Sequence, residues 1–406
     1  MAQAQKSIIG AWKALNESVL SVHQQRCAKV RNRNVQCLKC ADACTSGCIS
    51  LVDGELVIDA SKCVGCGTCA TVCPTCALEP LNPNDAELMS ECLNAARAGD
   101  GTTAYVACSR VVAACEGLLD DERVVHVVCL GRIEESLTCG LAAAGVEHIV
   151  LVCGMCDMCA QKYGRVTAES VITSSNDLLS AWNSPARVTL VHDVPGGALA
   201  AGVDEAQAAE AYAAYFAHEC ACEPIPAAQV ETLGYADEAD SFSGGQAGTD
   251  QRLTANGLSH VMKDGTLPHF IPNRRERLLD SLASMGTPQE KVLSSRLWGC
   301  VVIDGSKCTS CRMCATFCPT GAIRKFDNED GTFGVTHHPA DCVKCRSCHD
   351  ICREGAIIIQ DQTRTNYLMD GAVHTYTMRP RDVELDQAHQ ILDTIRLKIP
   401  GNVYER

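Results

Sequence analysis

Several features are missing from this sequence of 406 residues. It has no run of 18 apolar residues, so we expect no segment that spans a membrane. It also lacks an excess of basic residues, since 49 acidic and 35 basic side chains give a net charge of −14. That balance argues against binding to nucleic acid, whose phosphates require clustered Lys and Arg. The first residues, MAQAQKSIIGAWKALNESV, contain no basic segment followed by an apolar one. We therefore expect a cytoplasmic protein.

Common motifs for nucleotides and for hydrolysis are missing as well. We find neither a phosphate-binding loop nor a G-x-G-x-x-G fingerprint, and the pair Gly244–Gly245 lacks the strand-loop-helix setting that such a loop needs. No Ser/His/Asp set stands out, and aromatic residues make up only 4% of the chain. The chemistry has to come from another residue type.

Cysteine is the residue that is abundant, with 29 copies. A secreted scaffold held by disulfides is the first explanation to consider. The odd number, the lack of a signal segment and the recurring spacings of two and three residues argue against it. Thiols that are kept reduced are free to bind metal instead.

The C-terminal cysteines form two copies of the spacing C-x2-C-x2-C-x3-C, the first followed by Pro319 and the second by Arg353. This spacing is typical of two [4Fe–4S] clusters, in which the fourth cysteine of each motif binds the other cluster. We expect one cluster on Cys308, Cys311, Cys314 and Cys352, and the other on Cys342, Cys345, Cys348 and Cys318. A zinc ion needs only four thiolates, so two interleaved sets disfavour zinc.

The N-terminal cysteines are less regular. One motif is complete and consists of Cys63, Cys66, Cys69 and Cys73. The incomplete upstream motif can be aligned by the residues that follow the fourth cysteine of each complete motif. These are PTGAI after Cys318, REGAI after Cys352 and PTCAL after Cys73, and the matching residues upstream are TSGCI after Cys44. Cys44 is then the crossing ligand, and Cys37 and Cys40 are the second and third ligands. The first ligand is either Cys27 or Cys48, and we favour Cys27. Cys48 and Cys76 are then spare thiols.

Both regions resemble bacterial-type dicluster ferredoxins. The resemblance implies a ferredoxin-like 2[4Fe–4S] domain at residues 27–82 and another at residues 300–360, with four [4Fe–4S] clusters in all. The chain departs from the family pattern at Thr45 and Arg353, where proline is usual, and in the long interval from Cys27 to Cys37.

Between these regions, strand-like and helix-like segments alternate. The strand-like segments are residues 102–109, 124–131, 148–154 and 186–194. Alternation at these lengths predicts a parallel sheet with βαβ connections, so we expect an α/β domain at residues 100–196.

Cysteines recur where the predicted strands of this domain end. Cys108, Cys129 and Cys153 lie at or near strand ends, and Cys156 and Cys159 follow in the sequence CGMCDMC. Because the carboxyl ends of parallel strands meet at one edge of a sheet, the five thiols could form one metal site. For any one of them, a buried cysteine of the core is the simpler interpretation.

The stretch from CLGR to CGMCDMC resembles the iron–sulfur (delta) subunit of methyl-viologen-reducing hydrogenase, over about residues 100–165. The resemblance implies a [2Fe–2S] cluster on Cys108, Cys129, Cys156 and Cys159, which passes electrons between an oxidoreductase and its partner. Cys153 has no counterpart in that family. Zinc on the same ligands, or no metal, are the alternatives.

The remaining segments complete the expected organisation. We predict an N-terminal helix in residues 1–26, a linker of helices and loops at 197–299 with helices near 202–222 and 273–286, and a tail at 361–406 with a terminal helix. Cys115 and Cys139 should be core residues, and the pair Cys220 and Cys222 is too isolated to interpret. We expect His192 to be a structural histidine. We expect Arg274, Arg275 and Arg277 to lie on a solvated helix face.

Taken together, the sequence predicts a multidomain α/β and α+β protein with two ferredoxin-like modules around a parallel-sheet domain. Its function would be that of a non-catalytic electron-transfer subunit of an anaerobic oxidoreductase complex. By family context its partner would be a hydrogenase, a formate dehydrogenase or a tungsten- or molybdenum-pterin subunit, with a further electron carrier as a second partner. The alternatives are a stand-alone oxidoreductase with a dithiol at Cys153 and Cys156, and a non-catalytic redox sensor or cluster carrier.

Overall fold

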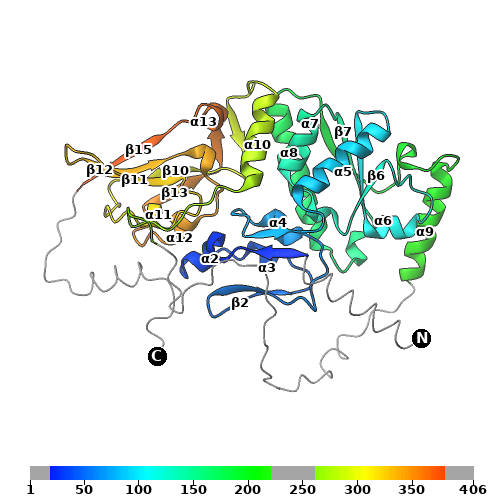
Figure 1. Cartoon of the computed structure of the whole chain (residues 1–406), viewed down its shortest axis with the longest axis horizontal. Helices are drawn as coiled ribbons and strands as arrows, with labels where there is room; N and C mark the ends of the chain where they lie inside the picture. Colours follow the sequence, from blue (N-terminus) through cyan, green and yellow to red (C-terminus); the bar gives the residue numbers. More distant parts are fainter. Residues whose placement is uncertain (1–18, 221–260, 380–406) are drawn as a thin grey trace, which may run out of the picture.

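The computed structural model describes residues 19–220 and 261–379. These residues form an N-terminal module, a central α/β domain and a C-terminal module, so the fold is the mixed α/β and α+β arrangement that the sequence predicts. In Figure 1 the N-terminal module, in blue, lies below the junction of the central domain and the yellow-to-orange C-terminal module. No helix within the described ranges combines the length and apolar character needed to cross a membrane.

The central domain is built on a four-stranded parallel sheet in the order β6-β5-β7-β8. The strands are β5 (Thr103–Cys108), β6 (Val124–Val127), β7 (His148–Val152) and β8 (Arg187–Val191), and each falls inside a predicted range. Their connections are α6 (Ser109–Ala114), α7 (Glu135–Ala143) and α8 (Tyr163–Ala181), and α5 (Asp85–Ala98) precedes the first strand. The strand order changes direction between β5 and β7, which makes the carboxyl ends of these two strands the usual position for a ligand.

The strands of this sheet are largely apolar because helices cover the sheet. Ile149, Leu151, Leu178 and Leu179 are fully buried in one continuous core. Burial of this kind is typical of parallel sheets and fixes the strand ends in place. The core thus provides a rigid edge from which the following loops project.

The two cysteine-rich modules share one order of elements. The C-terminal module contains β10 (Cys300–Ile303), α11 (Met313–Thr316), β11 (Ile323–Asp327), β12 (Phe333–His337), α12 (Ser347–Asp350) and β13 (Ile357–Gln360). The N-terminal module contains β1 (Leu20–Val22), α3 (Lys39–Asp42), β2 (Ile49–Val52), β3 (Glu55–Ile58), α4 (Thr68–Val72) and β4 (Leu78–Pro80). In both, the outer strands pair antiparallel, β1 with β4 and β10 with β13, and the inner strands form a hairpin.

The structure differs from the predicted domain bounds at two places. Leu20–Val22 form β1, and Gln24–Arg26 form the short 3₁₀ turn η1, so the described part of the predicted N-terminal helix is not an α-helix. The pairing of β1 with β4 explains the difference, because a sheet partner distant in sequence overrides local preference. The C-terminal module also extends past residue 360, because β15 (His374–Met378) pairs with β12.

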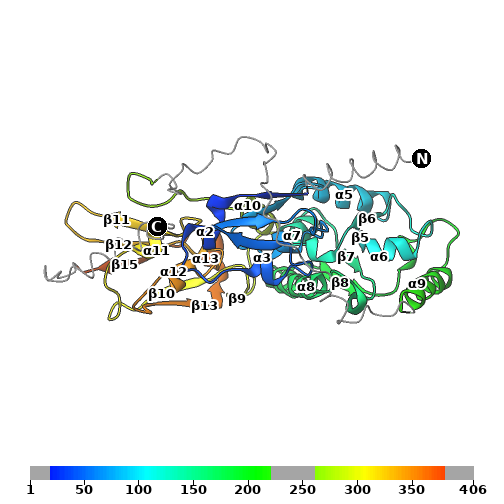
Figure 2. The ribbon, with the colours of Figure 1, turned by 90° about the horizontal axis from the view of Figure 1, so that it is seen from below.

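Some elements predicted for the linker and the tail lie among the described residues, and others lie outside them. The predicted helices of the linker appear as α9 (Glu205–Cys220) and α10 (Asn273–Ser284). The linker and tail also contain β9 (Val292–Ser294), which pairs with β14 (Gln362–Arg364), and α13 (Thr365–Met369). The predicted terminal helix and Cys222 lie outside the described residues. Figure 2 shows α10 beside α7, near the line where the modules and the central domain meet.

Candidate metal centres

The first cysteine of each motif follows a strand at a constant distance. Cys308 comes five residues after Ile303, Cys342 five after His337, and Cys63 five after Ile58, and these are the last residues of β10, β12 and β3. In the N-terminal module the same count from Val22, the last residue of β1, reaches Cys27.

The backbone at Cys27 also matches that of a regular first cysteine. Cys27 ends the turn η1 with φ −68° and ψ 119°. Cys342 ends the 3₁₀ turn η6 (Pro339–Asp341) with φ −76° and ψ 119°. The structure therefore gives Cys27, rather than Cys48, the position of a first cysteine.

The fourth cysteine of each motif precedes a strand at a constant distance. The strands β2, β4, β11 and β13 begin five residues after Cys44, Cys73, Cys318 and Cys352, respectively. In three motifs a hydroxyl two residues later lies near the sulfur, with Ser46 Oγ 3.4 Å from Cys44 Sγ, Thr75 Oγ1 3.7 Å from Cys73 Sγ and Thr320 Oγ1 3.9 Å from Cys318 Sγ. Cys44 thus has the surroundings of a crossing cysteine.

Cys48 is an addition to this repeated pattern. It stands where the other motifs have Ala77, Ala322 and Ala356, and like them it is buried. Its Sγ atom lies 3.4 Å from Cys44 Sγ. Cys48 therefore lies with Cys44 and Cys63, beside one of the two predicted clusters.

Neighbouring thiols show how the C-terminal cysteines group. Burial raises the pKa of Cys345 to about 12, and the nearby thiols of Cys318 and Cys342 raise it further. Burial also raises the pKa of Cys308, with contributions from Cys311 and Cys352. Each crossing cysteine thus lies with the other motif, which is the grouping that the spacing predicts.

The N-terminal cysteines group in the same way. Burial raises the pKa of Cys40 to about 12, and Cys73, Cys27 and Cys37 add to the rise in that order. For Cys69, burial and then Cys66 and Cys63 raise the pKa. The structure therefore brings together Cys27, Cys37, Cys40 and Cys73 as one set. Cys63, Cys66 and Cys69 form the second set, with Cys44 and Cys48 beside it.

The five cysteines of the central domain line one cavity at the carboxyl edge of the sheet. They are Cys108, Cys129, Cys153, Cys156 and Cys159. Burial raises the pKa of Cys129 to about 12, and Cys66, Cys108 and Cys159 contribute. Close backbone packing holds this loop, because a Cβ on Gly164 would lie 2.2 Å from Cys129 Sγ. The five thiols thus lie together at this edge of the sheet, beside Cys66 of the N-terminal module, and the metal site itself stays a prediction.

Cys153 and His192 form a contact that the sequence does not reveal. Cys153 Sγ lies 3.3 Å from His192 Nδ1, and both residues follow neighbouring parallel strands. A hydrogen bond with Cys153 lowers the pKa of Cys156 to about 7. The same hydrogen bond and burial raise the pKa of Cys153. Cys115 and Cys139 are buried in the core, as predicted.

The thiol sets consist of cysteine alone, and such donor sets suit iron–sulfur clusters. Within the described ranges, no three His, Cys, Asp or Glu side chains converge closely enough to hold one metal ion. Thiolates around a cluster bind separate iron atoms, so they stand farther apart than the ligands of one zinc ion. The described cysteines are all free thiols, and sets made only of cysteine select zinc, copper(I) or iron–sulfur clusters.

Buried arginine atoms next to one set also fit a bound group. Arg31 Nε and Arg275 Nη1 are buried without a hydrogen-bond partner among the described residues. Both arginines lie near Cys318, Cys342 or Cys345. Buried donors without an acceptor are rare in proteins, and a group with anionic sulfur would supply one.

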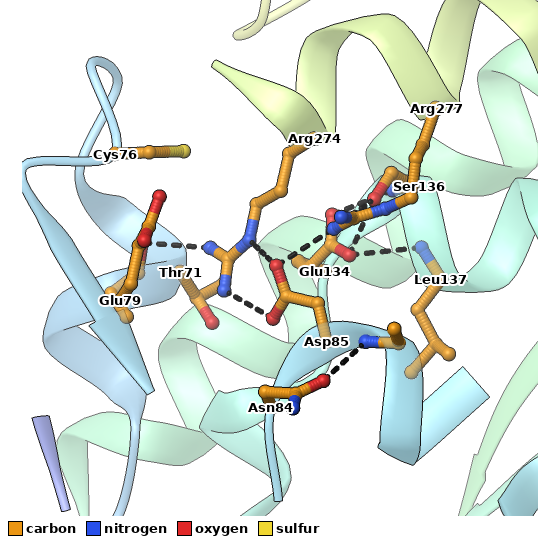
Figure 3. A network of polar contacts seen from close by, with 12 residues as sticks. Thr71, Cys76, Glu79, Asn84, Asp85, Glu134, Ser136, Leu137, Arg274 and Arg277 are labelled. Atoms are coloured by element: carbon orange, nitrogen blue, oxygen red, sulfur yellow. Dashed lines mark hydrogen bonds and ion pairs between the residues drawn. The ribbon is translucent and has the colours of Figure 1, made fainter. Parts of the chain in front are cut away.

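A buried ion-pair network joins the N-terminal module to the central domain and α10. Asp85 accepts from Arg274 and Arg277 (Figure 3) and also from Arg132, with a shortest distance of 2.7 Å in each pair. Arg274 Nη1 also donates to the carbonyl of Ala70 at 2.9 Å. Burial alone would raise the pKa of Asp85, but the hydrogen bonds and charges of Arg274 and its neighbours hold that pKa well below its usual range.

The prediction of a solvated arginine face on α10 is therefore wrong. Arg275 is buried, and Arg274 and Arg277 are partly buried and paired with Asp85. Their partners, Asp85 and the carbonyls of Ala70, Leu297 and Cys342, come from other segments. The local sequence NRRERLLDSL contains no sign of these distant partners.

Comparison with known proteins identifies the two cysteine-rich modules. A family model described as a 4Fe–4S dicluster domain matches residues 307–356. A second, described as a 4Fe–4S binding domain, matches residues 56–79. No curated protein and no solved structure matches the chain. The two family models together cover less than half of the chain. They establish 4Fe–4S ferredoxin-type domains in these two regions, and domains of this type are suited to electron transfer.

Proposed function

We propose that this chain is an electron-transfer subunit that relays single electrons through four [4Fe–4S] clusters and a [2Fe–2S] cluster in the central domain. Iron–sulfur clusters held by thiolates exchange one electron at a time, at potentials set by charge, hydrogen bonding and burial. The protein's part is to hold the clusters in sequence, to shield them from water and to present the two ends to partners.

The observation that carries this proposal is the continuity of the five thiol sets. Cys37 and Cys345 pack against one apolar cluster, which joins the N-terminal and C-terminal modules. Its buried members are Ala28, Val35, Leu267, Met313, Phe317 and Ile351. At the other side of the N-terminal module, the Cys66 thiol is close enough to raise the pKa of Cys129. Each set therefore has a neighbouring set within the same folded body.

The sets follow one another in an order different from the sequence. The order begins at Cys308, Cys311, Cys314 and Cys352, and continues to Cys318, Cys342, Cys345 and Cys348. It then passes through Cys27, Cys37, Cys40 and Cys73 to Cys44, Cys63, Cys66 and Cys69. It ends at Cys108, Cys129, Cys156 and Cys159. An electron can enter at either end, and no proton or covalent bond has to move with it.

Both ends of this order reach the protein surface. Cys311 is exposed at the C-terminal end. Beside the central-domain cysteines, large apolar side chains are exposed, namely Val128 and Met155, which line the same cavity, and Met158, which lies between Cys156 and Cys159 in the sequence. Exposed apolar groups that gather beside a redox site mark a surface for a protein partner. We propose that a catalytic subunit docks there, of the hydrogenase, formate dehydrogenase or tungsten- or molybdenum-pterin type that the family resemblance implies.

An anaerobic pull-down of the tagged chain from its native host tests this proposal. We expect a stoichiometric subunit with nickel, molybdenum or tungsten, detected by metal analysis of what co-purifies. Val128→Asp should abolish the capture, whereas Val373→Asp, a similarly exposed valine in the C-terminal module, should leave it intact. Purified chain that contains iron alone and still reduces a substrate would contradict the proposal.

The contact between Cys153 and His192 supports a second candidate, a thiol oxidoreductase with Cys153 and Cys156 as its dithiol. The two candidates differ in how they use Cys156, which cannot be both a cluster ligand and a free thiol. Alkylation of the anaerobically purified, native chain distinguishes them. Protection of Cys156 supports the cluster, and rapid labelling of Cys156 supports the dithiol.

A further inference from the structure

The long interval between Cys27 and Cys37 forms a docking element. It contains the short helix α2 (Ala28–Arg31) and a loop that enters the C-terminal module. Val35 is fully buried in the apolar cluster between the modules, and the amide of Gln36 donates to the Asp350 carboxylate at 2.9 Å. The interval from Cys27 to Cys37, where the chain departs from the ferredoxin pattern, thus contacts the C-terminal module.

Arg31 is the last residue of α2 and reaches a predicted cluster ligand of the C-terminal module. Its side chain is only 5% exposed. Nη1 donates to the carbonyl of Pro268 at 2.8 Å, and Nη2 donates to the carbonyl of Cys318 at 3.3 Å. His269 Nδ1 lies 3.0 Å from the same Cys318 carbonyl.

Arg275 reaches the same predicted cluster from the other direction. It comes from α10, is 6% exposed, and donates from Nη2 to the carbonyl of Cys342 at 3.3 Å. The same Nη2 contacts the carbonyl of Leu297, and the guanidinium lies 4.3 Å from the centre of the Trp298 ring. Two arginines from outside the C-terminal module thus hold the main chain of two ligands of one cluster.

The carboxylates of Glu135 and Asp341 lie near Arg275 but form no ion pair with it. Within the described ranges neither Arg31 nor Arg275 forms an ion pair with Asp or Glu. Burial lowers the pKa of each guanidinium to about 10, and nearby cysteine thiolates act in the opposite direction. A guanidinium is not deprotonated in proteins, so both side chains carry a positive charge at neutral pH. The unpartnered Arg31 Nε and Arg275 Nη1 leave one donor on each side available to the cluster.

The sister cluster in the same module has no such surroundings. Arg312, in its first motif, is paired with Asp327, whose two carboxylate oxygens lie 2.8 Å from Arg312 Nη1. Burial raises the pKa of Cys308 and of Cys314, and neighbouring thiols raise both further. The two clusters of one module would therefore differ in the positive charge buried beside them.

We propose that Arg31 and Arg275 raise the reduction potential of the cluster on Cys318, Cys342, Cys345 and Cys348 above that of its sister, so that this cluster holds an electron arriving from the C-terminal end. Reduction adds one negative charge to a cluster, and buried positive charge stabilises the reduced state. The step is a transfer of one electron from the sister cluster, which is oxidised as its neighbour is reduced. The inference rests on the proposed function, because it requires both clusters.

A redox titration of the anaerobically purified full chain, followed by electron paramagnetic resonance, tests this inference. In Arg275→Gln and in Arg31→Gln, we expect the potential of one cluster to fall while the others stay within error. A tenfold change in the one-electron equilibrium corresponds to about 59 mV, and we expect a shift of about this size from each substitution. Arg275→Lys keeps the charge and should lie nearer to the unmodified protein. Arg364→Gln changes an exposed arginine of the same region and should shift none of the potentials.

Iron and sulfide measured on the same samples separate the two levels of the proposal. If all clusters are present and neither glutamine variant changes a potential, or if all potentials move together, the arginine inference is wrong and the relay stands. If the unmodified chain lacks the clusters of the C-terminal module, the relay itself is wrong. Arg31→Gln and Arg275→Gln come from different segments, so one variant that fails to fold leaves the other to decide.

Discussion

The two ferredoxin-type modules repeat the same elements but differ in how regular their motifs are. In the C-terminal module, each first cysteine and the two that follow it are spaced by two residues, whereas Cys27 and Cys37 are separated by α2 and its loop. In both, however, the first cysteine comes five residues after a strand and the fourth comes five residues before one. The comparison indicates that strand ends fix the outer cysteines. The interval between the first and second cysteines can then lengthen into a docking element.

Substitution of Cys27 should have the largest effect on iron content and tests whether the two modules are equivalent. We expect Cys27→Ser to remove one cluster, which is about four iron atoms and four sulfides per chain. Cys48→Ala, which installs the residue found in the other three motifs, should retain all of them. Iron and acid-labile sulfide in anaerobically purified variants give the answer. Loss of iron from Cys48→Ala but not from Cys27→Ser would contradict the proposal that the two modules are equivalent.

A second large effect should come from the network that ties the N-terminal module to the central domain. Asp85→Asn leaves Arg132 and Arg274 buried with less compensating charge, and breaking a buried ion pair typically costs about 3 kcal/mol or more. We expect the free energy of unfolding of the holoprotein, measured with denaturant, to fall by about 3 kcal/mol. Asp121→Asn is the matched control, because that side chain is 89% exposed. An equal effect from both variants would contradict the account.

Acid should weaken the same network in a definite direction. The pKa of Asp85 is lower in the folded state than in the unfolded chain, so its stabilising contribution is present above the unfolded pKa. It is lost as the pH falls through the depressed pKa of the folded state. We therefore expect the difference in the free energy of unfolding between Asp85→Asn and the unmodified protein to become smaller as the solution is acidified. A difference that grows on acidification would contradict the assignment.

The smallest effect should come from Cys76. Three motifs place glycine at this position with positive φ, at Gly47 (64°), Gly321 (69°) and Gly355 (58°), whereas Cys76 adopts φ 46°. A left-handed conformation costs a residue with a side chain about 1 kcal/mol. We expect Cys76→Gly to be at least as stable as Cys76→Ala in thermal unfolding, and both variants to keep all iron. Loss of iron would show that Cys76 is a ligand and that the modules differ more than their strands indicate.

Part of the fold follows directly from the sequence. Apolar strands such as residues 148–154 predict the parallel sheet, because strands buried on both faces read as continuous apolar runs. Cysteine spacing predicts the C-terminal grouping, because ligands to one cluster must lie close along the chain or cross between repeats. The register of Cys44 follows from the residues after it, because they build the same turn into the next strand in each motif.

The remaining features depend on contacts between distant segments. Leu20–Val22 form a strand only because β4 offers a partner. Arg274 and Arg275 read as surface residues until Asp85 and the carbonyl of Cys342 are placed beside them. The contact of Cys153 with His192 needs β7 and β8 to be neighbours in the sheet. In each case the deciding partner is remote in sequence and carries no local signal.

The most direct test of the account is the iron, acid-labile sulfide and zinc content of the full chain purified anaerobically. Four [4Fe–4S] clusters and one [2Fe–2S] cluster predict about 18 iron atoms and about 18 sulfides per chain, with no stoichiometric zinc. About 16 of each with one zinc ion would remove the central domain from the relay. A content near that of a single ferredoxin module, about 8 of each, would contradict the relay of electrons along the whole chain.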